Sequence, residues 1–217
     1  MPTAEFRAAV KLRLGMVVLP REQLCMCGQL AGPYPDHYLV CKFGHHRSLR
    51  HDQVAIQTRL IFTALGQLSR VTGLDGVLPN APDGRRLIPD VYSPEAKEVL
   101  DISITHPASA AYVQDAAATD GATAAKREGS KTVKYKVAAT SVGLTFIPAV
   151  LESYGRTGLL FKQWFMEKVA LAEDELPPGW DSNWACRTFS AHFQQRIAVA
   201  LQRGNAEVVL KRARRDY

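Results

Sequence analysis

The stretch Ile88–Ser103, IPDVYSPEAKEVLDIS, decides the predicted fold of this chain. RLIPDVYS and EVLDISIT are short runs rich in Ile, Val and Leu, and the SPEAK segment between them predicts a strand pair joined by a tight turn. Asp90 lies in the first run, and Asp101 lies in the second between two apolar residues. A carboxylate in such a setting is costly unless something binds it. If the strands pair, Asp90 and Asp101 can reach one point at the edge of the sheet.

Two aspartates at one point suit a hard cation. Carboxylate oxygens favour Mg²⁺, which keeps several waters and accepts phosphate oxygens, and Mn²⁺ can take its place. EGSKTVKYK adds Lys131 and Lys134, three positions apart and so on one helix face. The set predicts a metal site with Asp90 and Asp101 as ligands and the two lysines as candidate catalytic cations. Taken singly, each residue also fits a structural role, as a strand-end acid or a solvated lysine.

A second candidate site lies upstream, in CMCGQLAGPYPDHYLVC. Three thiolates and an imidazole make a tetrahedral zinc set, here Cys25, Cys27, His37 and Cys41. The alternative is that these are buried small apolar residues and a surface histidine. The N-terminus lacks the apolar core of a secretory signal, so we expect a reducing, intracellular and nuclear location, where disulfides are disfavoured.

Composition limits the possible functions. The chain has 217 residues, 47% of them hydrophobic and 22% charged, which is ordinary for a soluble globular protein. No stretch approaches the roughly 18 apolar residues of a membrane span, so we expect no membrane partner. A net charge of +6 with a pI of about 9.2 favours a polyanionic partner, with nucleic acid first.

The predicted order of elements is helix, three strands, helix, strand and helices. Expected helices cover residues 5–15, 49–68 (ending at Gly73), the Ala-rich segment interrupted at Gly121, and two regions near the C-terminus. A short strand is expected at the start of GVLPNAPDGRR, before a turn. This order predicts an α/β fold with a small mixed sheet flanked by helices. The expected divisions are an N-terminal helix and zinc cluster (1–48), an α/β core (49–175) and a C-terminal helical extension (176–217).

The chain resembles a known family over nearly its whole length. It is similar to the restriction-like endonuclease domain, of PD-(D/E)xK type, at the C-terminus of non-LTR retrotransposon reverse transcriptases. The motifs that carry the resemblance occur in the family's order: FRAAVKLRLG, CMCG, DHYLVC, RHDQV, IPDV, LDISITHP, KTVKY, FIPAVLESYG and QRIAVALQRGNA.

The resemblance implies a restriction-endonuclease-like core behind a CCHC zinc knuckle. It implies metal ligation by Asp90 and Asp101, and a catalytic lysine moved from the strand to the following helix, as Lys131 or Lys134. Tyr135 would support that lysine or touch DNA. The sequence departs from the family at Ile88, where Arg or Lys is frequent, and it shows no polymerase motif, so a polymerase part would belong to a longer parent chain.

Three functions compete at this point. The first is a Mg²⁺-dependent endonuclease that cleaves double-stranded DNA. The second is a non-catalytic module that binds DNA or RNA through the zinc knuckle and a basic surface, with the nuclease-like core as its scaffold. The third is a junction-resolving nuclease of the same superfamily, which would need a dimer.

Overall fold

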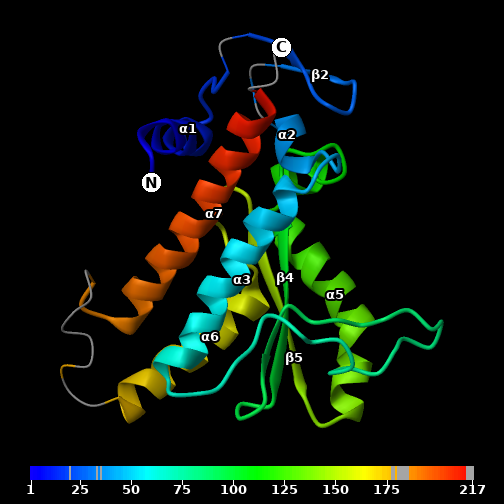
Figure 1. Cartoon of the computed structure of the whole chain (residues 1–217), viewed down its shortest axis with the longest axis vertical. Helices are drawn as coiled ribbons and strands as arrows, with labels where there is room; N and C mark the ends of the chain where they lie inside the picture. The colour runs from blue at the N-terminus through cyan, green and yellow to red at the C-terminus, as the bar shows by residue number, and fades with distance from the viewer. Residues whose placement is uncertain (20, 33, 35, 177–178, 180–185, 214–217) are drawn as a thin grey trace.

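The structure is a computed structural model that describes residues 1–217 except 20, 33, 35, 177–178, 180–185 and 214–217 (Figure 1). The described helices are α1 (Thr3–Arg13), α2 (Asp36–Val40), α3 (His46–Ala64), α4 (Val113–Ala118), α5 (Ala122–Ser141), α6 (Leu159–Glu175) and α7 (Phe189–Ala213). The described strands are β1 (Gln23–Leu24), β2 (Leu30–Ala31), β3 (Val91–Ser93), β4 (Glu98–Thr105) and β5 (Thr145–Glu152). The fold is mixed α/β, with small sheets flanked by helices, as the sequence predicts.

The main sheet has three strands in the order β3-β4-β5. β4 pairs antiparallel with β3, with Val91 opposite Leu100, and parallel with β5, with Asp101 opposite Pro148. The antiparallel pair is the one predicted across the SPEAK turn, so that prediction is confirmed. The connection from β4 to β5 runs through α4 and α5, as a parallel pair requires.

The two faces of β4 meet different helices, because successive strand side chains point to opposite faces. Leu100 and Ile102 belong to a hydrophobic cluster with residues of α3, α6 and α7. Val99 belongs to a second cluster with Tyr135 and Ala139 of α5. Figure 1 shows α3 and α5 on either side of β4. Asp101 shares its face with Val99 and therefore lies toward α5.

The helix boundaries confirm one prediction and correct another. Gly121 has a φ of 81° and separates α4 from α5, as predicted. The predicted end of α3 at Gly73 is wrong, because the helix ends at Ala64 and Gly66 follows with a φ of 70°. Glycine adopts this left-handed conformation without steric cost, and helices often end where it does.

The strand predicted at the start of GVLPNAPDGRR is absent. Residues 76–80 form no strand. The edge strand β3 instead pairs with a single residue outside the sheet, through a β-bridge between Arg70 and Tyr92. Pro79 and Pro82 lack the N–H group that a strand must donate, which disfavours a ladder here. The turn that follows is present, since Gly84 N donates to the carbonyl of Ala81 at 2.8 Å.

Helix α7 supports both halves of the molecule. Its Phe193 and Leu201 pack in the cluster that contains the sheet. Further along, Val208 and Val209 pack against Cys25 and the rest of the N-terminal region. One helix thus packs against both the sheet and the region of the Cys/His cluster. No helix in the described ranges is long and apolar enough to cross a membrane.

Candidate metal centres and cleft

The predicted acids face a common cleft of about 590 Å³. Asp90, Asp101, Lys131 and Tyr135 all line it, together with residues from the start of α3. Lys134 is not part of the lining. The structure therefore brings three of the four predicted catalytic residues to one cavity.

Asp101 is buried at the bottom of this cleft. Only 3% of the residue is exposed, and its Oδ2 lies 2.6 Å from Lys131 Nζ. The Ser103 hydroxyl donates to the same oxygen at 3.3 Å, and Arg127 Nε donates to Ser103 Oγ at 3.3 Å. Ser103 shares the α5 face of the strand because it is two residues from Asp101. The buried carboxylate is thus balanced by a lysine and a hydroxyl.

Asp90 lies one residue before β3, where the ladder with β4 stops. Its backbone N–H donates to the carbonyl of Leu100 at 2.8 Å, and its Oδ2 accepts from Ile102 N at 2.6 Å. β3 ends before it reaches Ile102, so the Asp90 carboxylate accepts the hydrogen bond from the Ile102 N–H in place of a strand partner. This contact fixes the Asp90 side chain beside the strand that carries Asp101.

His51 completes the wall of the cleft on the α3 side. Its Nε2 lies 3.0 Å from Asp90 Oδ2 and 3.1 Å from the carbonyl oxygen of Ile102, and its Nδ1 lies 3.0 Å from Asp52 Oδ1. Both ring nitrogens face acceptors, an arrangement that favours the imidazolium form of His51. Burial alone would lower the pKa of His51, but the hydrogen bonds to Asp90 and Asp52 outweigh it and raise the pKa to about 9.

Sequence reasoning missed His51 as a partner of the acids. The sequence suggests His51 as a spare zinc candidate or, more simply, as a surface or capping histidine, and it suggests Arg50 and His51 as a phosphate contact or as a joint between the zinc region and the core. Arg50 is the joint: its guanidinium donates to Asn205 Oδ1 at 2.8 Å and to the carbonyl of Leu39. The sequence feature that could have identified His51 is the adjacent Asp52 in the RHD motif, since a carboxylate often orients an imidazole.

Lys134 points to a tyrosine rather than to an acid. Its Nζ donates to Tyr135 Oη at 3.0 Å, and Tyr135 Oη donates to the carbonyl of Ile88 at 3.4 Å. The Tyr135 ring stacks on Phe146 of β5, with centroids 5.1 Å apart. Burial and the charge of Asp101 raise the pKa of Tyr135, so its hydroxyl stays protonated. Tyr135 therefore anchors α5 to the residue preceding Pro89.

The four predicted zinc ligands converge. The donor atoms of Cys25, Cys27, His37 and Cys41 all lie within 4.8 Å of one another. The Cys25 and Cys41 sulfurs are 3.7 Å apart, and Cys27 Sγ is 3.2 Å from His37 Nε2. Sulfurs bound to one tetrahedral zinc are separated by roughly 3.8 Å, since Zn–S bonds are about 2.3 Å. The cluster therefore fits a zinc ion.

The backbone of the cluster follows from its glycine and its short hairpin. β1 and β2 pair antiparallel, and Gly28 between them has a φ of 85°. Its N–H donates to the Cys25 carbonyl at 2.8 Å, which closes the tight turn that presents Cys27. His37 lies in α2, and Cys41 directly follows that helix.

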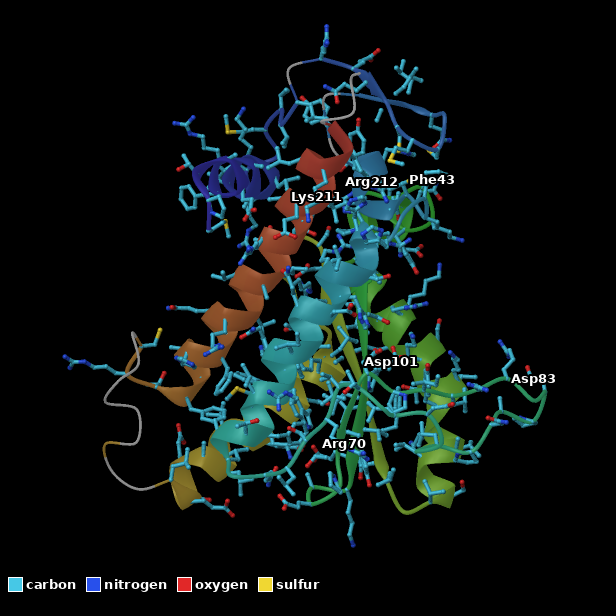
Figure 2. All side chains as sticks on the ribbon, in the orientation of Figure 1. Phe43, Arg70, Asp83, Asp101, Lys211 and Arg212 are labelled. Carbon is cyan, nitrogen blue, oxygen red and sulfur yellow. The ribbon has the colours of Figure 1, made fainter. Side chains whose placement is uncertain are left out.

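The end of α7 supports the zinc ligands electrostatically. Arg212 is 3% exposed and donates through Nη2 to the carbonyls of Cys41 and Phe43 (Figure 2). Burial raises the pKa of Cys41, but the Phe43 N–H and hydrogen bonds from Cys27 and Arg212 outweigh it and lower the pKa. Burial and the charge of Arg212 lower the pKa of His37. Both shifts favour the forms that bind metal, thiolate and neutral imidazole.

A buried histidine ties the zinc region to β4. His106, directly after the strand, contacts Ser153 Oγ through Nδ1 at 2.7 Å and Asp36 Oδ1 through Nε2 at 3.0 Å. Asp36 precedes the ligand His37 and also accepts from Tyr154 Oη. The hydrogen bond to His106 lowers the pKa of Asp36. In the sequence, THP places His106 at the end of a strand and predicts a residue held there by hydrogen bonds rather than a catalytic group, and these contacts confirm the hydrogen-bonded strand-end role.

No protein-family model matches this sequence, and no curated protein is similar enough to it to count as a relative.

We expect one zinc per chain in protein purified without chelator. Cys25→Ser combined with Cys41→Ser should abolish zinc binding, because it removes two of four ligands, and should unfold the knuckle. Cys186→Ser is the matched control, since Cys186 is outside the cluster and donates to Gln195. Elemental analysis measures the stoichiometry. Full retention of zinc by the double variant would contradict the assignment.

Proposed function

We propose that this chain is a metal-dependent endonuclease that hydrolyses phosphodiester bonds of DNA, and that its core is of the restriction-endonuclease type. One observation carries the proposal: the β3–β4 pair brings Asp90 and Asp101 to one cleft, with Lys131 2.6 Å from Asp101. Carboxylates from adjacent strands beside a positioned amine are a set that metal-dependent phosphoryl chemistry uses.

The donor set fits a hard divalent cation. Asp90, Asp101 and the carbonyl oxygen of Ile102 offer oxygen ligands, and Mg²⁺ or Mn²⁺ would complete its shell with water and a substrate phosphate oxygen. Such an ion would neutralise charge on the phosphoryl centre and lower the pKa of a water nucleophile. Of the residues themselves, Lys131 would supply positive charge toward the scissile phosphate, while the carboxylates would hold the cation.

The ion pair between Lys131 and Asp101 is better explained by function than by stability. The two side chains are only 13% and 5% exposed. Buried pairs often stabilise a protein no better than apolar residues of the same size, because desolvation offsets their attraction. A lysine next to a catalytic carboxylate, by contrast, places positive charge where the transition state gains negative charge.

The zinc cluster supports the same proposal. The resemblance implies a CCHC knuckle before the nuclease core, and the cluster is joined to β4 through Asp36 and His106. A zinc module fixed beside the cleft would guide DNA toward the acids. We propose double-stranded DNA as the substrate and a retroelement origin for the domain.

A non-catalytic nucleic-acid-binding module is the second candidate, and His51 favours it. The His51 imidazolium contacts Asp90 and the Ile102 carbonyl, which are two of the three oxygen donors proposed for the metal. If His51 holds that position permanently, the acids have a structural role. The cleft would then bind nucleic acid without cutting it.

Cleavage of supercoiled plasmid distinguishes the two candidates. Wild-type protein should nick or linearise the plasmid when Mg²⁺ or Mn²⁺ is added, and should leave it intact when both ions are absent. Asp90→Asn and Asp101→Asn should each lower the rate more than about 100-fold, because they remove several kcal/mol of transition-state stabilisation, while binding survives.

Asp83→Asn is the matched control for these variants. Asp83 pairs with Arg85 at the tip of an exposed loop, far from Asp101 in Figure 2. The control should cleave at the wild-type rate. Folded wild-type protein that binds DNA but shows no metal-dependent cleavage would overturn the endonuclease and leave the binding module.

Substitutions of Lys131 and Lys134 should have different effects on the cleavage rate. From the sequence, we expect Lys134 to carry the rate effect and Lys131 to support binding. The contact to Asp101 favours the reverse, so we propose that Lys131→Ala lowers the single-turnover rate at saturating DNA by about 10²–10³. Lys134→Ala should have a smaller effect, through Tyr135. A rate defect confined to Lys134→Ala would restore the original expectation.

A further inference from the structure

The cleft contains more positive than negative charge. Among the described residues that line it, five are Lys or Arg and three are Asp. Lys131 pairs with Asp101, whereas Arg50 is buried and hydrogen-bonds to neutral groups, Asn205 and a backbone carbonyl. Arg47 and Arg127 have no carboxylate partner in the described part of the chain: Arg47 donates to the Val40 carbonyl and Arg127 to Ser103 Oγ.

These two arginines are partly buried and repel their neighbours. Burial lowers the pKa of Arg47, and the charges of Arg212 and Arg127 lower it further. The charge of Cys41 acts in the opposite direction and raises the pKa of Arg47. Like charges therefore lie close together here, and within the described residues neither arginine forms an ion pair with a carboxylate. Such an arrangement is unfavourable alone and becomes favourable when a polyanion enters.

The two guanidinium groups come from opposite walls of the cleft. Arg47 lies in the first turn of α3, which carries no acidic residue there, and Arg127 lies on α5. Arg127 is four residues before Lys131, so both share one face of the helix. Through Ser103, Arg127 is also linked to Asp101. The arginines thus border the acids from two sides.

We propose that Arg47 and Arg127 form a phosphate clamp that holds the DNA backbone next to the phosphate facing Asp90 and Asp101. A guanidinium binds phosphate through two parallel hydrogen bonds, which suits positioning. That the bound polymer is DNA rests on the proposed function, but the clamp itself requires no cleavage of that DNA.

Binding in the absence of Mg²⁺ and Mn²⁺ tests the clamp. Fluorescence anisotropy of a labelled DNA duplex, at several salt concentrations, gives affinity and salt slope for zinc-loaded protein. Arg47→Gln and Arg127→Gln should each weaken binding and reduce the slope of log K against log salt by about 0.9, because each removes one phosphate contact. Arg47→Lys and Arg127→Lys should retain most of the slope.

Arg59→Gln is the matched control. Arg59 lies on the same helix as Arg47, is also partly buried, and does not line the cleft. It should leave affinity and slope unchanged. Unchanged slopes in folded Arg47→Gln and Arg127→Gln, or an equal loss in Arg59→Gln, would overturn the clamp.

Footprinting of wild-type protein gives a second measurement that does not depend on variants folding. Phenylglyoxal modifies accessible arginines, and DNA should protect Arg47 and Arg127 but not Arg59. Modification of Arg47 and Arg127 that DNA does not slow would contradict the clamp. If DNA protects Arg47 and Arg127 but the protein shows no metal-dependent cleavage, the clamp is supported and the endonuclease is rejected. Failure of the clamp and failure of the endonuclease are therefore distinguishable.

Discussion

The buried carboxylate of Asp101 is the constraint on which the rest of the site depends. A charge on a central strand is tolerated only where neighbours compensate for its lost hydration. Lys131 and Ser103 do so from the α5 side. The opposite face of β4 stays apolar and packs on α3, α6 and α7. One strand therefore joins a stable core to a charged cleft.

Side-chain hydrogen bonds connect the Cys/His cluster to the elements that form the cleft. Arg50 connects α3 to α7 through Asn205, and Arg212 connects the end of α7 to the carbonyl of Cys41. His106 connects the end of β4 to Asp36, next to a zinc ligand. The Arg50 and Arg212 contacts are buried and the His106–Asp36 contact is partly buried, and buried polar groups hold their geometry because leaving one unpaired is costly. These contacts join α3, β4 and α7 to the region of the Cys/His cluster.

The local features of this fold could be predicted from the sequence, whereas its long-range contacts could not. The strand pair with Asp90 and Asp101 follows from apolar runs around a turn, and the zinc ligands follow from residue type and spacing. His51 and Arg212 reach their partners across 51 and 171 residues, so only packing brings them together. The choice between Lys131 and Lys134 depends on how α5 is rotated against the sheet, which their common helix face does not determine.

The central claim is that Asp90 and Asp101 together form a divalent-cation site. Electron paramagnetic resonance of Mn²⁺ added to zinc-loaded protein measures free Mn²⁺ and gives bound Mn²⁺ by difference, without DNA and without catalysis. The account predicts one bound Mn²⁺ per wild-type chain and loss of that ion in both Asp90→Asn and Asp101→Asn. Mn²⁺ binding that is absent from the folded wild-type protein, or unchanged in both variants, would contradict it.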